Sequence, residues 1–221
     1  DCAIQGAEFL RKYGHDGAYN WYFSLNREGK PLIVPYNIYS YTFAAMAFGQ
    51  LSLITGIEEY TDIARKTYEK ILMRSSNPKD QWNKAIPGTR DLKNFAFPMI
   101  LCNLSLEIEP LLDQKVMNDT ITKCLHEVMD VFWRPEIGLV VENITTDEQL
   151  SDSFDGRLVN PGNALEAMWF IMDLGVRLNR PDIIHKATDI GLNMLQYGWD
   201  EQYGGIFYYM DRLDYPPQQL E

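Results

Sequence analysis

Apolar residues that recur at spacings of three and four constrain the fold of this chain more than any other feature. They predict seven helices, the first of them partial, over about residues 1–12, 36–55, 57–74, 91–109, 113–133, 160–178 and 181–197. The helices at 91–109 and 160–178 are apolar almost all round, which indicates burial, and nearly all-apolar helices alternate with amphipathic ones. Pro98, inside the third long helix, should kink it or mark its true start.

Between the helix pairs lie aromatic-rich segments that are typical of hairpins. Residues 19–25 and 32–35 flank a turn at 26–30, residues 138–144 precede a second turn, and residues 204–210 precede a third. A helix pair closed by a hairpin cannot bury its apolar face alone and must stack on its neighbours. The sequence therefore predicts an all-α fold of inner and outer helices, an (α/α)6 toroid. Seven helices would form an incomplete sector of it, as a single domain over 1–221.

Both ends of the chain are also informative. It opens at Asp1 in what reads as mid-helix, without an initiator Met, and closes on a turn at Pro216 and Pro217. Neither end carries the helix cap or stop signals of a finished domain. We therefore expect the chain to be an internal part of a longer protein.

Composition excludes several classes of function. The net charge of −11 argues against binding to nucleic acid, which requires a basic surface. No apolar run approaches the roughly 18 residues of a membrane span. The three cysteines, Cys2, Cys102 and Cys124, are odd in number and lack metal-ligand spacing, so we expect reduced thiols, no metal site and a cytoplasmic protein.

Polar side chains gather where the helix at 160–178 begins. Asn160 and Pro161 form an N-cap signal, and Asn163 and Glu166 lie three residues apart, on about the same face. A carboxylate in so apolar a helix must be paired, hydrogen-bonded or raised in pKa. Two interpretations stay open: Glu166 forms an ion pair that ties down the Arg157 loop, or Arg157, Glu166 and the helix N-terminus hold a polar ligand.

Aromatic residues near helix starts and in the hairpins, including Tyr36 and Trp169, give a second indication. Sugars present apolar C–H faces and hydroxyl rims, which suit aromatic rings beside carboxylates and amides. Aromatic residues are also routine core residues, so this pattern alone is weak.

At these positions the chain resembles a known family. Residues 156–170, Gly-Arg-Leu-Val-Asn-Pro-Gly-Asn-Ala-Leu-Glu-Ala-Met-Trp-Phe, resemble the stretch G-R-x-x-N-P-G-H-x-x-E-A-x-W-F of N-acylglucosamine 2-epimerases. Residues 35–40, 87–90, 198–200, 203–208 and 219–221 resemble further family segments in the same order. The resemblance covers the whole chain but only the middle of a family member.

The resemblance implies an α/α toroid that interconverts N-acetylglucosamine and N-acetylmannosamine by removing the C2 proton and returning it to the other face. The family uses histidines as the acid/base groups, and one of them falls at Asn163, whose amide cannot exchange a proton near neutral pH. Glu166 and Glu221 fall on catalytic positions of the family. Arg157, with Tyr36 and Trp169, would bind the sugar.

Family members are commonly activated by ATP through a basic loop, although no cofactor is required. The matching residues 75–84 retain Lys79 and Lys84 but include Asp80 and no glycine nest for phosphate. An ordinary solvated loop between helices is the other interpretation of this segment.

Three functions are weighed for the whole protein. The first is a sugar 2-epimerase, impaired in this chain by Asn163 and by the missing segments. The second is an aldose–ketose isomerase on the same fold, and the third is a non-catalytic sugar-binding protein. A glycoside hydrolase is disfavoured because it needs two facing carboxylates. The expected partner is a small sugar, and a homodimer is one of the assemblies left open.

Overall fold

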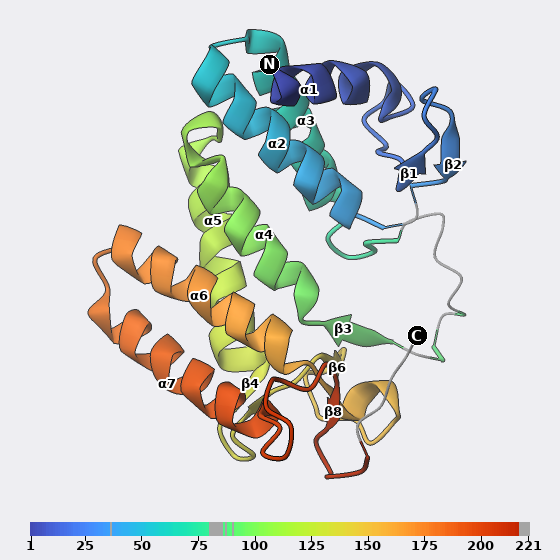
Figure 1. Cartoon of the computed structure of the whole chain (residues 1–221). Helices are drawn as coiled ribbons and strands as arrows, with labels where there is room; N and C mark the ends of the chain where they lie inside the picture. The colour runs from blue at the N-terminus through green and yellow to red at the C-terminus, as the bar shows by residue number, and fades with distance from the viewer. Residues whose placement is uncertain (36, 80–85, 87, 90, 217–221) are drawn as a thin grey trace. The chain divides into compact units, whose positions relative to one another are not determined.

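The computed structural model of the chain describes residues 1–35, 37–79, 86, 88–89 and 91–216 (Figure 1). The chain divides into two compact units, one of residues 1–85 with 104–117 and one of residues 86–103 with 118–221. The prediction of a single domain over 1–221 stays a prediction.

The first unit is built on a pair of helices, α2 (Tyr39–Thr55) and α3 (Glu58–Met73), together with α1 (Cys2–Tyr13). Gly56 ends α2 in the left-handed region at φ 70°, and its N–H bonds the carbonyl of Ser52, which turns the chain directly into α3. The core is aromatic and includes the fully buried rings of Tyr41, Phe48, Tyr60 and Tyr68. A hairpin of β1 (Ser24–Leu25) and β2 (Pro31–Ile33) joins this unit as predicted.

The end of α4 (Ala96–Glu107) completes the first unit. A Cβ on Gly49 would lie 2.4 Å from Cγ2 of Ile108, so the backbone of α2 touches the segment that follows α4. Tyr68 and Ser105 share a buried hydrogen bond of 2.8 Å between their hydroxyls. Packing at this site therefore depends on a glycine in the middle of an otherwise apolar helix.

The second unit pairs α6 (Pro161–Arg177) with α7 (Pro181–Gly198) and adds α5 (Gln114–His126) and the π-turn Glu127–Val131. The helix pair packs closely at both ends. A Cβ on Gly175 would lie 2.6 Å from Cγ1 of Ile184, and one on Gly198 would lie 2.5 Å from Cβ of Pro161. Ala164, Ala167, Met168, Phe170, Ile171 and Leu174 form the buried face of α6.

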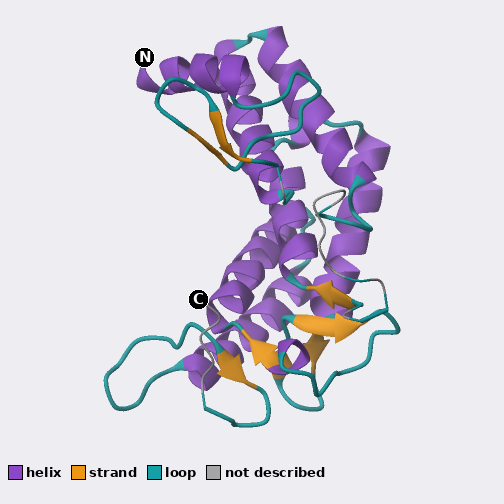
Figure 2. Ribbon diagram, turned by 90° about the vertical axis from the view of Figure 1, so that its right-hand side faces the viewer, coloured by secondary structure: helices purple, strands orange, loops and turns teal. Residues whose placement is uncertain are grey.

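Three short antiparallel strand pairs accompany these helices in the second unit (Figure 2). They are β3 (Leu92–Asn94) with β6 (Asn143–Thr145), β4 (Trp133–Arg134) with β5 (Leu139–Val140), and β7 (Leu158–Val159) with β8 (Met210–Asp211). Because β7 runs directly into α6, these strands bring segments far apart in sequence to the beginning of that helix.

The helix predictions are confirmed within a few residues, but two strand predictions are wrong. Residues 92–94 form a strand, not the start of a helix, and the helix begins at Ala96, so Pro98 marks its first turn. Neither 138–144 nor 204–210 pairs with the residues just after it. Within the first, β5 pairs with the preceding β4, and β6 begins its pairing with the distant β3; within the second, Met210 pairs with Val159 of β7. Turn chemistry reports local geometry only, whereas the pairings of β3 with β6 and of β7 with β8 are set by long-range packing.

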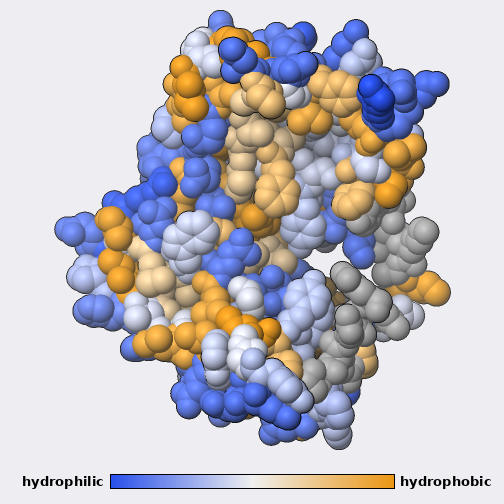
Figure 3. Space-filling view, in the orientation of Figure 1, coloured by the Kyte–Doolittle hydropathy of each residue, from blue (hydrophilic) through white to orange (hydrophobic). Residues whose placement is uncertain are grey.

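One helix of the first unit leaves part of its apolar surface exposed. In α2 of the first unit, Phe43, Leu53 and Ile54 are exposed, and Figure 3 shows apolar surface over this helix. The apolar composition of α2 therefore reflects two faces, one packed on α3 and one open in the described part of the chain. None of the described helices is both long enough and apolar enough to cross a membrane.

Candidate functional site

The candidate site begins at the N-terminus of α6. Asn160 is the N-cap, in the extended conformation, and its side-chain oxygen accepts the N–H of Asn163 at 2.9 Å. Pro161 follows at the first helical position, where its missing N–H costs no hydrogen bond. Both parts of the predicted helix start are confirmed, and they fix the backbone at position 163.

The Asn163 side chain points to a buried carboxylate that the sequence analysis missed. Its Nδ2 donates to Oε1 of Glu142 at 3.1 Å, and Glu142 is 6% exposed. The backbone of Glu142 is held on both sides. Its N–H donates to the carbonyl of Leu158, and its carbonyl accepts from the N–H of Phe95 and from Nδ2 of Asn94. The carboxyl group is therefore part of a fixed scaffold.

Burial raises the pKa of Glu142 from 4.5 to about 7, and the hydrogen bond from Asn163 opposes this shift only in part. A carboxyl group with such a pKa is half protonated near neutral pH, so it can hold or release a proton there. One sequence signal could have found it: Glu142 directly follows the apolar run Leu139-Val140-Val141.

Tyr209, next to β8, is the ionisable neighbour of this pair. Its pKa is raised to about 12, mainly by burial, then by hydrogen bonding to Tyr208 and by the charge of Glu142, while a hydrogen bond with the Asn160 side chain lowers it. The rings of Tyr208 and Tyr209 lie 4.4 Å apart, and Tyr208 is exposed. The site therefore joins a phenol, two amides and a carboxyl group.

An exposed stripe runs along α6 from the same point. Asn163 is half-buried, and Glu166 and Trp169 are exposed at the following two turns. The prediction that Asn163 and Glu166 share a face is confirmed. The prediction that Glu166 is constrained by burial is wrong, because the stripe faces away from the buried side of α6. Together, these residues offer a carboxylate and an indole to solvent.

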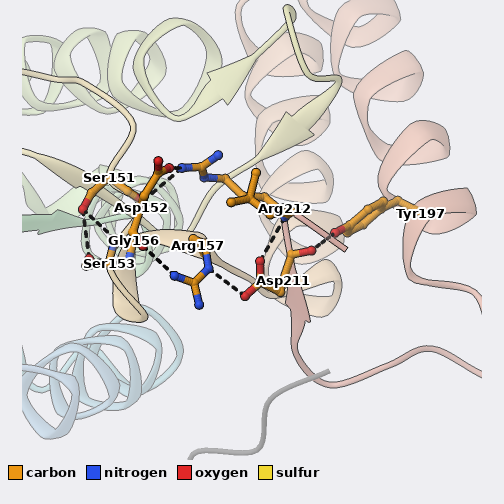
Figure 4. A network of polar contacts seen from close by, with 9 residues as sticks. Ser151, Asp152, Ser153, Gly156, Arg157, Tyr197, Asp211 and Arg212 are labelled. Carbon is orange, nitrogen blue, oxygen red and sulfur yellow. Dashed lines mark hydrogen bonds and ion pairs between the residues drawn. The ribbon is translucent and has the colours of Figure 1, made fainter. Parts of the chain in front are cut away.

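Arg157 belongs to a separate network in the second unit (Figure 4). Its Nε donates to Oδ2 of the buried Asp211 at 2.9 Å, and its Nη1 donates to the carbonyl of Asp152. The Asp211 carbonyl in turn accepts the hydroxyl of Tyr197 at 3.0 Å. The sequence suggested an ion pair that ties down the Arg157 loop. Such a pair exists, but its partner is Asp211 and not Glu166.

A second arginine strengthens this connection. Arg212 bonds the Ser151 carbonyl at 3.1 Å and forms an ion pair with Asp152, so both arginine side chains join residues 151–157 to residues 211–212. Gly156 fits closely here, since a Cβ at this position would lie 2.5 Å from Cβ of Ser151. These contacts hold the loop that leads into β7 and α6.

The other predicted site residues are not brought together by the described structure. Tyr36, Lys84 and Glu221 lie outside the described residues. Lys79 is exposed and belongs to the first unit. Two open depressions of about 540 and 370 Å³ are lined by residues of α7 and its neighbours, and neither set of lining residues includes Asn163 or Glu142.

Comparison with known proteins identifies the family. The profile of the N-acylglucosamine 2-epimerase (GlcNAc 2-epimerase) family matches residues 1–221. This chain belongs to that family. Its relatives include the N-acylglucosamine 2-epimerases of Rattus norvegicus and Bos taurus, each 30% identical over 229 aligned positions. The match covers all of this chain and 54% of each relative, so the chain spans about half the length of the curated relatives it matches.

Solved structures agree on the fold. Cellobiose 2-epimerase from Bacillus thermoamylovorans aligns with a TM-score of 0.76 at 16% identity, covering 92% of this chain and 56% of that one. A sugar epimerase from a ruminal bacterium gives 0.71 at 18% identity, with 93% and 56% covered, and a D-mannose isomerase gives 0.68 at 16%, with 96% and 57% covered. The predicted all-α toroid class, present as an incomplete sector, is confirmed.

Proposed function

We propose that the whole protein is a sugar 2-epimerase that interconverts N-acetylglucosamine and N-acetylmannosamine by transferring the C2 proton. The family match over residues 1–221 supports the reaction class. The observation that carries the proposal is the cluster at the start of α6, where Asn163 donates to the buried carboxyl of Glu142 and the exposed Glu166 follows three residues later. This is the position at which the family places a histidine.

The proposed chemistry needs a group that accepts the C2 proton and a second group that returns a proton to the opposite face. The electron pair of the broken C–H bond moves toward the C1 carbonyl of the ring-opened sugar, giving an enolate that still carries the 2-acetamido group and is reprotonated at C2. Trp169 and Glu166 would bind the sugar along the exposed stripe. The indole of Trp169 would pack on an apolar C–H face of the sugar, and the carboxylate of Glu166 would accept a hydrogen bond from a hydroxyl. The amide of Asn163 can hold a sugar hydroxyl but cannot carry the proton.

A second candidate is a non-catalytic sugar-binding protein, and Asn163 is the observation that favours it. An aldose–ketose isomerase is the alternative within enzymes, in line with the fold shared with a D-mannose isomerase. The substrates separate these two reactions, because the 2-epimerase acts on an N-acetylated sugar and an isomerase needs a free 2-hydroxyl group.

The deciding experiment follows the loss of the C2 proton signal of N-acetylmannosamine in D₂O by NMR, with the full-length protein. The wild-type protein is compared with Asn163→His, and Asn163→Gln serves as the matched control that keeps an amide. We expect exchange to rise about 100-fold or more in Asn163→His, the contribution of one acid/base group, and to stay unchanged in Asn163→Gln.

Each other outcome selects an alternative. Saturable sugar binding without exchange in any variant would replace the epimerase with a binding protein. Isomerisation of mannose, without exchange in N-acetylmannosamine, would select the isomerase.

We also propose a cytoplasmic location and activation by ATP near the exposed Lys79. The three free thiols support the first of these. Equilibrium dialysis of the full-length protein with ATP, compared between wild type and Lys79→Gln, tests the second. Equal binding in both would remove Lys79 from the nucleotide site.

A further inference from the structure

Glu142 is the feature of the second unit that neither the predicted site nor the family motif accounts for. It lies between β5 and β6, 21 residues before Asn163 and outside the motif that carries the resemblance. Its carboxyl group is buried, and its hydrogen-bond partner is the one side chain in the motif at which this chain departs from the family pattern. Burying a carboxyl group is costly, so its retention at this place requires a reason.

The geometry defines what this carboxyl group does to its neighbour. Asn163 is half-buried, with its backbone fixed by the Asn160 cap and its Nδ2 directed at Oε1 of Glu142. An amide that donates one N–H inward keeps its carbonyl oxygen as an acceptor and its second N–H as a donor. The Asn163 oxygen is then the acceptor that the side chain can offer to a ligand at the start of α6.

We propose that Glu142 is a positioning residue of the sugar site, whose buried carboxyl group holds the side chain at position 163 from behind and decides which atom that side chain presents to the sugar. With asparagine, the presented atom is a carbonyl oxygen that accepts a sugar hydroxyl. With an imidazole, the ring N–H would bond Glu142 and the other ring nitrogen would face the sugar, free to take a proton. This inference rests on the proposed function for the identity of the ligand.

The same carboxyl group suits both side chains because it accepts one N–H in either case. An imidazole held by a carboxylate has a fixed tautomer and ring orientation, and its protonated form is stabilised by the negative charge. Glu142 would therefore orient an imidazole as it orients the Asn163 amide, without any movement of the backbone that the Asn160 cap fixes.

The charged groups around Glu142 leave this interaction free of competition. Tyr209 faces it and is neutral at pH 7, because its pKa is about 12. On β3, Lys93 forms an ion pair with Glu148. Before β7, Arg157 forms its ion pair with Asp211. The negative charge of Glu142 therefore interacts mainly with the side chain at position 163.

The test measures the pKa of the introduced imidazole by NMR titration of its ring protons in full-length Asn163→His. The same titration is run on Asn163→His combined with Glu142→Gln and, as the matched control, combined with Glu136→Gln. Glu136 is an exposed glutamate between β4 and β5. We expect the imidazole pKa to fall by about one unit or more when Glu142 is replaced and to stay unchanged when Glu136 is replaced. Equal imidazole pKa values in all three proteins would overturn the proposal.

A second measurement uses the native side chain and does not depend on the folding of Asn163→His. The side-chain amide signals of Asn163, identified by their loss in Asn163→Asp, are followed from pH 5 to 9 in ¹⁵N-labelled protein. We expect them to shift with a midpoint near pH 7 in wild type and to stay constant in Glu142→Gln. A constant signal in wild type would refute the contact.

Both titrations are made without sugar and without turnover. A negative result therefore removes the positioning role of Glu142 while leaving the proton-exchange experiment to decide the function. Failure of that exchange experiment would leave the titrations unaffected.

Discussion

Replacing Glu142 with glutamine should change how the stability of the protein depends on pH. The folded state raises the pKa of this carboxyl from 4.5 to about 7 by burying it. A group whose folded pKa is raised contributes its full share of stability below its unfolded pKa, and this share is lost as the pH rises through the folded pKa. The wild-type protein should therefore lose stability relative to Glu142→Gln between about pH 4.5 and pH 7.

The size of the effect follows from the shift. Each unit of pKa corresponds to about 1.4 kcal/mol, so a shift of about 2.5 units makes a full difference of about 3.4 kcal/mol. Part of this loss has already occurred at pH 5, which lies above the unfolded pKa. Between pH 5 and pH 8, the linkage relation gives a change of about 2.5 kcal/mol.

The assay is urea unfolding of wild type and Glu142→Gln at pH 5, 6, 7 and 8, with the difference in unfolding free energy plotted against pH. A constant cost of placing an amide beside Asn163 cancels in this plot, because it does not depend on pH. Glu136→Gln controls for the loss of one exposed carboxylate. A difference between wild type and Glu142→Gln that is the same at pH 5 and pH 8 would refute the burial argument.

Three further substitutions test the scaffold of the site by thermal or urea unfolding. Asn160→Ala should cost about 1 kcal/mol through loss of the helix cap, whereas Asn160→Asp should retain most of it; equal losses would contradict the cap. Gly198→Ala should cost about 1–3 kcal/mol, because its Cβ would lie 2.5 Å from that of Pro161, and an unchanged melting temperature would show that the helix pair relaxes easily. Asp211→Ala should cost about 2 kcal/mol by removing a charged hydrogen bond from Arg157, and proteolysis within residues 145–157 should become faster; unchanged cleavage would show that the loop is held by other contacts.

Helices were predictable in this chain because their signal is local. The periodic apolar positions of α3 and α7, the Gly56 stop and the Asn160-Pro161 start all lie within the segment they define. The β1–β2 hairpin was predictable for the same reason, but the strand pairs between distant segments were not. Leu92–Asn94 pairs with Asn143–Thr145 across about fifty residues, and neither short segment carries a sequence signal that identifies its partner strand.

The same distinction between local and long-range signals applies to the residues of the candidate site. Asn163, Glu166 and Trp169 were found because a helix places residues three apart on one face. Glu142 was missed because its contact with Asn163 depends on β3, β6 and β7 coming together, which is a long-range event. The error over Glu166 has a related cause: composition indicated an apolar helix, but only packing decides which of its faces is buried.

The pKa of Glu142 and the identity of residue 163 are two parts of one equilibrium. A neutral amide donates one hydrogen bond to the carboxyl but brings no charge, so burial dominates and the pKa stays near 7. An imidazole at the same place would form an ion pair with the carboxylate, which would lower the pKa of Glu142 and raise that of the imidazole by interaction with the same partner. Asn163→His should therefore move the pH-dependent loss of stability to higher pH, because the pair holds its proton until the pH exceeds the ordinary imidazole pKa of about 6.5, and it should do so in the same protein in which proton exchange at C2 increases. A variant that gained exchange while it still lost stability below pH 7 as wild type does, relative to Asn163→His combined with Glu142→Gln, would show that the introduced base works without Glu142.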